Sequence, residues 1–280
     1  MSANIIDGKA VALNIKDILK EKINKLPFTI KLAVAKVGDD PASAVYVKNK
    51  IKACEYVGIQ SVSYQFDYQI TQKELEIEIN KLILDDSIDG ILVQLPLPKH
   101  INEQEIIDLI PLEKDVDGFS DINLGKLAAQ KQCTVACTPF GVMKLIESTN
   151  VDLMGKNAVV VGRSNNVGKP IAMLLLNANC TVTICHSKTK NLTDFTKNAD
   201  ILVCAVGRPN TITGDMVKHG AIVIDVGINR TESGLVGDVD FNSVKEVASY
   251  ITPVPGGVGP MTVTMLMQNT YELALRRRSE

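Results

Sequence analysis

The sequence has little imbalance of charge and no long apolar run. It has 30 Lys and Arg residues and 32 Asp and Glu residues. The formal net charge of −2 gives no support for a nucleic-acid-binding surface. No apolar stretch reaches the roughly 18 residues of a membrane-spanning helix, and the N-terminus has no signal-peptide core. The one basic cluster, at residues 276–278, is most simply a solvated helix end. We therefore expect neither nucleic acid nor a membrane among its partners.

Histidine is scarce, and the cysteines lack metal-binding or redox spacing. The three histidines show neither a metal-ligand pattern nor the spacing of a catalytic triad, so no metal is expected. The cysteines are scattered without a CxxC motif, which favours reduced core thiols and a cytoplasmic location over disulfides. They are Cys54, Cys133, Cys137, Cys180, Cys185 and Cys204.

What the chain does have is a regular alternation of strand-like and helix-like segments over 280 residues, which is long enough for two domains. In the first half, apolar runs predict strands at 30–37, 61–66 and 90–95, with helices at 43–57, 71–85 and from 102 onward. Thr71 and Glu74 form a capping box at the start of one helix. Residues 115–132 lack strong periodicity, and we expect a hinge region there.

A second α/β series follows and predicts a doubly wound parallel sheet. Its strands are expected at 157–162, 180–185, 201–206 and 221–226, and its helices at 167–177, 191–197 and 213–219. Thr138 supplies an N-cap for a preceding helix that runs to Ser148. The fold class is therefore two α/β domains, the second Rossmann-like, with a C-terminal helix packing back on the first. The expected boundaries are 1–137 with 262–280 for one domain and 138–261 for the other.

A glycine-containing turn follows the first strand of the second series. The segment 162–168, GRSNNVG, joins that strand to a helix, which is where a dinucleotide-binding fold places its phosphate-binding turn. Ser164 and Val167 stand where the second and third glycines of GxGxxG would be, so the motif alone is weak evidence. Its place between strand and helix makes Gly162, Arg163 and Ser164 candidates for cofactor binding.

The end of the next strand indicates which dinucleotide is bound. Folds that prefer NAD place an Asp or Glu there, where it bonds the ribose 2′-hydroxyl. Here the strand ends in His186, Ser187, Lys188 and Thr189, with no acid. Arg163, together with Ser187 or Lys188, could instead hold a 2′-phosphate. The sequence therefore favours NADP over NAD, and a solvent-exposed loop cation is the less favoured interpretation of Arg163.

Four polar residues in the first half are candidates for chemistry. Tyr46 and Lys50 lie four apart on a predicted helix and project from one face, although an amphipathic helix edge explains that spacing equally well. Gln94 interrupts an apolar strand at its carboxyl end, where α/β sheets place ligands, and a buried amide there must find partners. Asp117 lies in the loop 114–119, where an ordinary turn aspartate before glycine is the plainer interpretation.

The segment 252–263, TPVPGGVGPMTV, is unusually rich in Pro and Gly. Proline fixes φ while glycine permits conformations that other residues avoid, so a stiff loop of unusual shape is predicted. We expect Thr262 to start the last helix. We also expect at least one cis bond among Leu95-Pro96 and Val254-Pro255, because both lie beside the candidate residues where the chain must turn sharply.

Eight motifs occur in one order along nearly the whole chain. They are YVKNK (46–50), VQLPLP (93–98), KDVDGF (114–119), CTPFG (137–141), GRSNNVGKP (162–170), CHSKT (185–189), DVGIN (225–229) and TPVPGGVGPMTV (252–263). Together they resemble the bifunctional methylenetetrahydrofolate dehydrogenase/cyclohydrolase family. The resemblance implies a homodimeric enzyme that oxidises 5,10-methylenetetrahydrofolate to 5,10-methenyltetrahydrofolate with NADP. It implies that the same site then hydrolyses this product to 10-formyltetrahydrofolate.

The resemblance also implies roles for the candidates. Loss of hydride leaves a delocalised cation and needs no strong base, whereas water addition needs proton transfer, for which Lys50 would be partly deprotonated. Gln94 would hold the amine of Lys50, Tyr46 would pack against the folate rings, and Asp117 would bond the N–H groups of the pterin. Further substrate-binding residues would be Val93, Leu95, Pro255, Gly256, Gly257, Val258, Gly259, Pro260, Met261, Thr262 and Val263. The cofactor-binding residues would be Gly162, Arg163, Ser164, Ser187 and Ile228.

Three other interpretations belong to different classes. A dehydrogenase of the shikimate type would use a Lys/Asp pair on a hydroxyl group, but it leaves the segment 252–263 unexplained. A non-catalytic dinucleotide sensor would tolerate the loss of Lys50 and Gln94, both of which are present. A dehydrogenase without cyclohydrolase activity is disfavoured because Tyr46, Lys50 and Gln94 are all intact.

Overall fold

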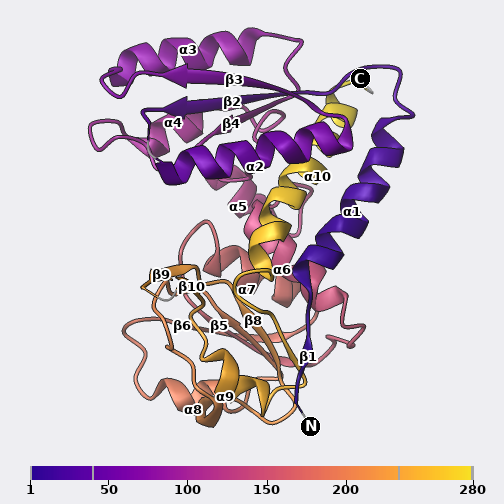
Figure 1. Cartoon of the computed structure of the whole chain (residues 1–280), viewed down its shortest axis with the longest axis vertical. Coiled ribbons are helices and arrows are strands. Elements are labelled where there is room, and N and C mark those ends of the chain that lie inside the picture. The colour runs from indigo at the N-terminus through magenta and orange to yellow at the C-terminus, as the bar shows by residue number, and fades with distance from the viewer. Residues whose placement is uncertain (1, 40, 233, 279–280) are drawn as a thin grey trace. The chain divides into compact units, whose positions relative to one another are not determined.

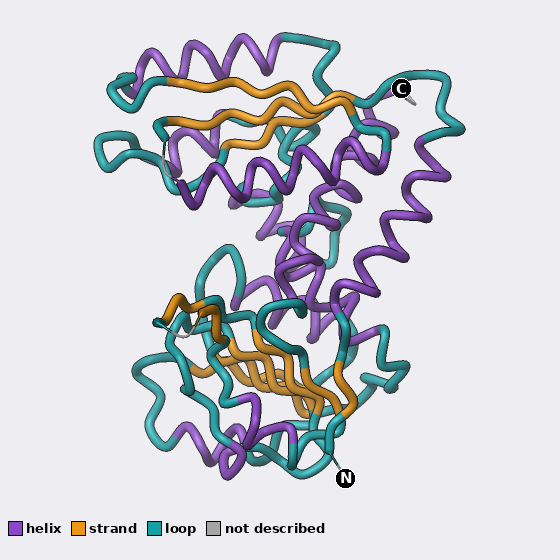
Figure 2. Tube along the Cα trace, in the orientation of Figure 1, coloured by secondary structure: helices purple, strands orange, loops and turns teal. Residues whose placement is uncertain are grey.

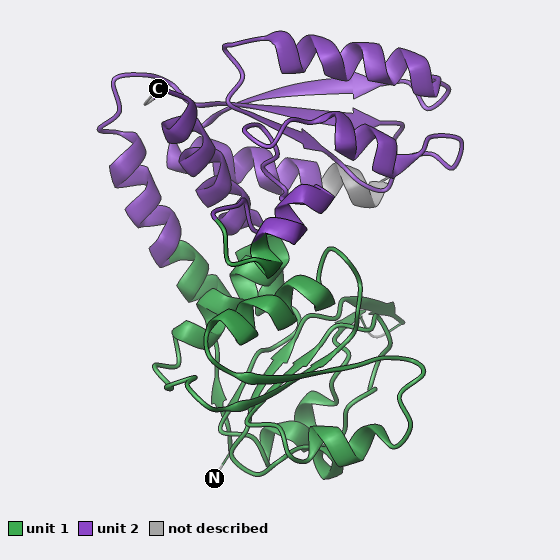
Figure 3. Cartoon of the chain, turned by 180° about the vertical axis from the view of Figure 1, so that it is seen from behind, with its two compact units in different colours: residues 1–13, 127–131, 136–262 green, residues 14–126, 132–135, 263–280 purple. Residues whose placement is uncertain are grey.

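The computed structural model describes residues 2–39, 41–232 and 234–278, except for the side chains of 41–45. The chain divides into two compact units, coloured separately in Figure 3. Unit 1 comprises Met1–Leu13, Leu127–Lys131 and Ala136–Thr262. Unit 2 comprises Asn14–Lys126, Gln132–Val135 and Val263–Glu280. Three helices contribute residues to both units, namely α1 (Gly8–Ile23), α5 (Asp121–Ala128) and α10 (Val258–Arg278).

Unit 2 is built on a three-stranded parallel sheet, which Figure 2 shows in orange. Its strands are β2 (Lys31–Val37), β3 (Gln60–Phe66) and β4 (Gly90–Val93), in the order β3-β2-β4. Its other helices are α2 (Pro41–Val57), α3 (Gln72–Leu84) and α4 (Glu103–Leu109). Strand β2 is central and almost wholly buried, as its continuous apolar run predicts.

The helices of unit 2 cover both faces of this sheet (Figure 1). Leu75 and Ile79 of α3 pack with Ile106 of α4 in one core cluster against Ala35 and Val93, while α2 crosses the opposite face. The predicted capping box is confirmed, because the side chains of Thr71 and Glu74 each accept from the other's backbone N–H. Because helices pack on both faces, the sheet and its carboxyl edge lie between two layers of helix.

Unit 1 is built on a six-stranded sheet of entirely parallel pairings, in the order β1-β11-β8-β7-β5-β6. Its strands are β1 (Asn4–Ile5), β11 (Tyr250–Ile251), β8 (Ile222–Asp225), β7 (Ile201–Cys204), β5 (Asn157–Val161) and β6 (Thr181–Cys185). Helices α6 (Cys137–Glu147), α7 (Gly168–Asn177), α8 (Leu192–Thr196) and α9 (Phe241–Lys245), the 3-10 turn Gly214–Met216 and the hairpin β9 (Asn229–Thr231)–β10 (Gly234–Val236) complete it. The predicted doubly wound α/β fold is confirmed.

Several elements differ from the expectations. The first 13 residues, expected in the folate-binding domain, belong to unit 1 because β1 pairs with β11. Helix α5 occupies part of the expected hinge, and the helix expected at 213–219 is only a single 3-10 turn. Short elements of this kind are stabilised by their tertiary neighbours and leave little periodicity in the sequence.

Two expected helix caps are wrong. Helix α6 begins at Cys137, and the hydroxyl of Thr138 instead shares a hydrogen bond of 2.9 Å with that of Thr262. Helix α10 begins at Val258, four residues before Thr262, so half of the Pro/Gly segment is helical. Pro260 is tolerated there because N–H groups in the first turn of a helix have no intrahelical acceptor.

The basic end of α10 is not solvated as expected. Arg278 donates from Nε and Nη2 to the carboxylate of Asp89 at 2.9 and 3.0 Å, and Asp89 is fully buried. Arg277 donates to the carbonyl of Ile88 at 2.6 Å. A buried carboxylate needs such a cation, so the end of α10 anchors the start of β4. None of the helices within the described ranges combines the length and the apolar character needed to cross a bilayer.

Candidate active site

Lys50 and Gln94 meet at the carboxyl edge of the sheet in unit 2. Lys50 lies on α2, and its Nζ donates to Oε1 of Gln94 at 2.9 Å. Gln94 directly follows β4, where its backbone N–H bonds the carbonyl of Ala35 at 2.8 Å. Its side-chain Nε2 donates to the carbonyl of Leu95 at 2.6 Å. Both ends of the Gln94 amide are therefore fixed, and its oxygen is aimed at the amine.

Asp117 belongs to the same electrostatic group. It lies half-buried in the loop after α4, and burial raises its pKa to about 6, with the Asp115 charge adding to the rise and the Lys50 charge opposing it. The carboxylate of Asp115 accepts hydrogen bonds from the backbone of Gly118 and Ser120 and from the side chain of Asn123, at 2.9 to 3.1 Å. This folded loop presents Asp117 near Lys50.

Helix α10 supports the Asp117 loop from behind. The side-chain Nδ2 of Asn269 donates to the carbonyls of Val116 and Val135, both at 2.9 Å, and Asn269 is buried. Asn269 follows Val116 by 153 residues, so the loop that carries Asp117 is held by a helix from a distant part of the chain.

The remaining predicted residues of unit 2 lie around this group with different exposures. Tyr46 is 45% exposed and lies one helical turn before Lys50 on α2. Leu95 is half-buried, whereas Val93 is a buried member of the core. The Leu95-Pro96 bond is cis, and so is Val254-Pro255 in unit 1, so the prediction of at least one cis bond is confirmed.

In unit 1 the Pro/Gly segment packs tightly on the start of α1. An ideal Cβ at Gly257 would lie 2.6 Å from the carbonyl oxygen of Pro253, and one at Gly8 would collide with the carbonyl of Gly257. Only glycine permits this approach of two backbones. The side chain of Ile228 lies 4.0 Å from the ideal Cβ position of Gly259, so the DVGIN motif adjoins this segment.

The turn after β5 has the strand–turn–helix position of a phosphate-binding turn. Gly162 has φ +133, and a Cβ there would collide with the carbonyl of Ala205. The Ser164 hydroxyl accepts from the N–H of Gly168, the first residue of α7, at 3.3 Å. Arg163 and Ser164 are exposed, so the start of α7 places a positive dipole end beside an exposed arginine.

At the end of β6 the chain makes a tight turn that holds no carboxylate. The N–H of His186 donates to the Thr189 hydroxyl at 2.9 Å, and the N–H of Lys188 donates to Nδ1 of His186 at 3.1 Å. Ser187 and Lys188 are exposed on this turn. The donor set therefore suits a 2′-phosphate better than a 2′-hydroxyl, and the turn after β5 has the position of a dinucleotide-binding turn.

The structure thus brings the predicted residues together in two groups. Unit 2 gathers Tyr46, Lys50, Gln94 and Asp117, and unit 1 gathers the turn 162–164, Ile228 and most of the Pro/Gly segment. Val263 falls in unit 2, while residues 255–262 fall in unit 1.

Sequence reasoning overlooked two features of unit 1. The loop 205–208 follows β7 beside the Gly162 turn, and the buried acids Asp225 and Asp238 lie at the same end of the sheet. An aspartate that ends an apolar strand, as in IVID, was the available signal for the first acid. Asp238 gives no comparable local pattern.

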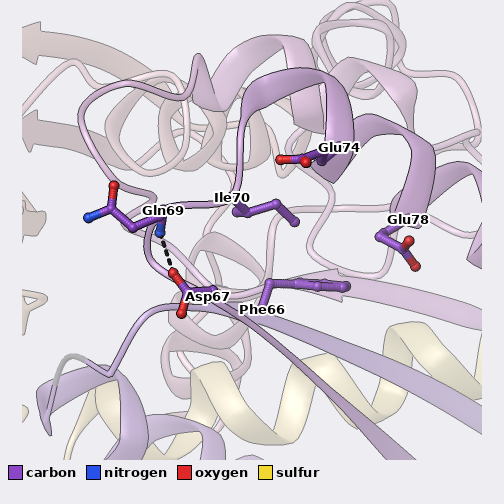
Figure 4. A pocket seen from close by; sticks show the side chains of 6 residues that line it. All are labelled: Phe66, Asp67, Gln69, Ile70, Glu74 and Glu78. Carbon is purple, nitrogen blue, oxygen red and sulfur yellow. Dashed lines mark hydrogen bonds between the residues drawn. The ribbon is translucent and has the colours of Figure 1, made fainter.

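A cavity of about 520 Å³ lies elsewhere in unit 2, beside the start of α3 (Figure 4). It is lined by Phe66, Asp67, Gln69, Ile70, Glu74 and Glu78, none of which the sequence predicts as a site residue. Its polar groups serve local structure, because Asp67 accepts from the N–H of Gln69 at 2.7 Å and Glu74 completes the capping box.

Comparison with known proteins gives one consistent answer. Residues 6–117 match the catalytic domain of the tetrahydrofolate dehydrogenase/cyclohydrolase family, and residues 136–278 match its NAD(P)-binding domain. The bifunctional protein FolD of Agathobacter rectalis is 55% identical over 279 residues, with 98% of this chain and 100% of that protein covered.

Two solved structures agree closely. The bifunctional enzyme FolD, a methylenetetrahydrofolate dehydrogenase/cyclohydrolase, from Campylobacter jejuni has a TM-score of 0.96 and 53% identity, covering 99% of this chain and 100% of that one. The Trypanosoma brucei methylenetetrahydrofolate dehydrogenase-cyclohydrolase, complexed with NADP and an inhibitor, has a TM-score of 0.94 and 37% identity with 100% of both chains covered. The chain therefore belongs to the tetrahydrofolate dehydrogenase/cyclohydrolase family.

Proposed function

We propose that this protein oxidises 5,10-methylenetetrahydrofolate to 5,10-methenyltetrahydrofolate with NADP and hydrolyses that product to 10-formyltetrahydrofolate. The observation that carries the proposal is the 2.9 Å hydrogen bond from Lys50 Nζ to Gln94 Oε1 at the carboxyl end of β4. It places an amine, aimed by a fixed amide, beside a half-buried carboxylate in a chain of this family. A dinucleotide sensor has no use for this arrangement. A shikimate-type dehydrogenase would use a Lys/Asp pair, but it leaves the segment 252–263 unexplained.

Lys50 is the proton-transfer group of the cyclohydrolase step. A neutral amine acts as a base through its lone pair, which must point at the attacking water. Gln94 Oε1 accepts one N–H of Lys50 and so restricts the directions left to the remaining substituents of the nitrogen. Gln94 is itself held by Leu95 and by the β2 backbone, which keeps this restriction constant during turnover.

Asp117 and Tyr46 bind the folate. The carboxylate of Asp117 accepts hydrogen bonds from the amino and ring N–H groups of the pterin, which are neutral donors that water would otherwise satisfy. A half-buried acceptor strengthens such bonds because water competes less for it. The exposed ring of Tyr46 gives the planar substrate a stacking surface on the same helix as Lys50.

Unit 1 holds NADP, which accepts the hydride from the methylene carbon when bound. The turn from Gly162 to Ser164 and the start of α7 receive the pyrophosphate. Arg163 and Ser187 pair with the 2′-phosphate, and Ile228 offers apolar contact to the cofactor. The functional boundaries expected from the sequence are kept, with 1–137 and 262–280 as the folate-binding catalytic domain and 138–261 as the NADP-binding domain, although residues 1–13 pack with unit 1. Val93, Leu95 and Val263 contribute to the folate site of unit 2.

The enzyme acts as a homodimer in the cytoplasm. Strand β6 lies at one edge of the six-stranded sheet and, within the described residues, pairs only with β5. Its Ile184 is 42% exposed and Leu176 of α7 is 58% exposed, which is the kind of edge that a second copy covers. All six cysteines are thiols and not disulfides, which suits a reducing compartment. Light scattering on the protein and on Ile184→Lys tests the dimer, which this variant weakens.

Ultraviolet absorbance tests the proposed reaction directly. Purified protein mixed with methylenetetrahydrofolate and NADP should show the methenyl compound forming and then decaying. Supplying the methenyl compound alone isolates the hydrolytic step. NADP-dependent formation without faster decay than in buffer would leave only a dehydrogenase, and the absence of both would refute the proposal.

A further inference from the structure

Two buried carboxylates in unit 1 have no part in the function proposed above. Asp225 is the last residue of β8, and Asp238 follows it by thirteen residues. Their side chains are 3% and 0% exposed. Burying a charge is costly unless hydrogen bonds satisfy it, so each carboxylate must hold something in place.

Asp238 gathers the loop that follows β7. Its Oδ2 accepts from the backbone N–H of Val206 at 2.6 Å and of Gly207 at 2.9 Å, and its Oδ1 accepts from the N–H of Arg208 at 2.8 Å. The side-chain Nδ2 of Asn229 adds a fourth bond to Oδ1 at 2.9 Å. Three consecutive backbone donors thus converge on one carboxylate, as they otherwise do on a bound anion.

Asp225 fixes Asp238 in turn. Its Oδ1 accepts from the N–H of Asp238 at 2.9 Å and of Gly227 at 3.0 Å, and its Oδ2 accepts from the N–H of Val239 at 3.0 Å. The loops after β7 and β8 are therefore locked to one another through a chain of two carboxylates.

The position of these loops follows from the strand order. In a dinucleotide fold the turn after the first strand holds the pyrophosphate, and the next strand's end holds the ribose of the adenosine half. Here those are β5 and β6, and β7 and β8 lie on the other side of β5. The loop after β7 adjoins the phosphate turn, because the carbonyl of Ala205 packs against Gly162. The loops after β7 and β8 are therefore the ones that would bind the nicotinamide half of NADP.

We propose that Asp238 is a positioning residue that shapes the nicotinamide half of the NADP site. This proposal rests on the assignment of NADP to unit 1. Because Asp238 occupies the N–H groups of residues 206–208, this loop offers no anion site that competes with the turn after β5. The loop presents its carbonyl groups and side chains instead, and the negative charge behind it favours the end of the cofactor that carries the positive pyridinium ring. Asp225 keeps this arrangement rigid.

Calorimetric titration of the full-length protein with two ligands tests the proposal. NADP⁺ probes both halves of the site, whereas adenosine 2′,5′-bisphosphate probes only the adenosine half. Asp238→Asn replaces an acceptor with an NH₂ group that faces backbone donors. It should weaken NADP⁺ roughly ten- to hundredfold, and it should leave the adenosine fragment within about twofold of wild type because the β6 end is untouched.

A matched control and a milder variant keep the test decisive. Asp240→Asn makes the same chemical change two residues away, where the carboxylate bonds only the nearby Ser243 hydroxyl among the contacts described, and should bind both ligands normally. Should Asp238→Asn fail to fold, Asn229→Ala removes one donor to Asp238 and should weaken NADP⁺ selectively, by a smaller factor.

The outcomes separate this proposal from the one on which it rests. Wild-type protein that binds neither ligand would remove NADP from unit 1 altogether. Wild-type binding with unchanged NADP⁺ affinity in folded Asp238→Asn, or an equal loss of both ligands, would overturn the positioning role alone.

Discussion

The two units build their sites from different parts of the chain. In unit 2 the candidate chemistry belongs to side chains, since Lys50, Gln94 and Asp117 act through their functional groups. In unit 1 the candidate site is mostly backbone, shaped by the turn at Gly162 and by N–H groups whose direction buried acids determine. Removal of one functional group should therefore cause a large loss of activity in the side-chain site. A single substitution in the backbone site should cause only a partial loss of cofactor affinity.

The largest effect is expected for Lys50→Met, which removes the amine and keeps a similar stem. General acid–base catalysis contributes roughly 10²- to 10⁴-fold, so methenyl hydrolysis should fall by that factor. Stability should change little because Lys50 is not in the core. The measurement is decay of methenyl absorbance, with exposed Lys48→Met on the same helix as control. Wild-type hydrolysis in Lys50→Met would remove Lys50 from the mechanism.

Arg163→Ala should have a smaller effect, confined to one cofactor. Loss of one charge-assisted bond to a phosphate costs about 1.5–3 kcal/mol, which is roughly ten- to hundredfold in KM for NADP. The KM for NAD should barely change because NAD has no 2′-phosphate. Initial rates with both cofactors measure this, and exposed Lys190→Ala serves as the control for loss of a loop cation. An equal loss with both cofactors would place Arg163 away from the 2′-phosphate.

Gly162→Ala tests whether unit 1 depends on its backbone. The residue has φ +133, and its new Cβ would meet the carbonyl of Ala205, so the turn must shift at a cost of roughly 1–3 kcal/mol. We expect weaker NADP binding together with a lower melting temperature. Gly155→Ala, also at positive φ but with open space around its Cβ, controls for backbone strain alone. If both variants lose NADP affinity equally, close packing at Gly162 is not what the site needs.

The sequence predicts the central strands because their apolar runs are long and their partners lie in the same series. It predicts the pairing of Lys50 with Gln94 only through the resemblance, since helix spacing says nothing about a strand 44 residues away. The preference of hydroxyl residues for helix starts predicts caps at Thr262 and Thr138, yet in the fold their hydroxyls bond each other. Arg278 reads as a solvated charge, and only the tertiary structure brings buried Asp89 to it. Local patterns thus predict elements, and long-range polar partners remain hidden.

The smallest expected effect is that of Asp117→Asn, which should stabilise the protein and weaken its function. Burial raises the pKa of Asp117 to about 6 from an ordinary value of 3.8. Between pH 3.8 and about pH 6 this carboxyl therefore binds more protons in the folded protein than in the unfolded chain. Its ionised form therefore costs stability above pH 6, and that cost disappears as the pH falls towards 4. Asp117→Asn removes the charge and should raise the melting temperature at pH 7.5, where roughly 1 kcal/mol corresponds to about 2–4 °C. The same variant should weaken folate binding, because it replaces one carboxylate acceptor with a donor.

Melting curves of both proteins at pH 4.5 and 7.5 measure this difference. The advantage of Asp117→Asn should shrink at pH 4.5, where the wild-type carboxyl is largely protonated in the folded state. Asp108→Asn, at an exposed position of α4, should show no such pH-dependent gain. A gain of equal size at both pH values would mean that packing, and not the charge of Asp117, sets the stability of this site. A pH-dependent gain accompanied by lost folate affinity would show that unit 2 keeps an unfavourable buried charge because its substrate requires it.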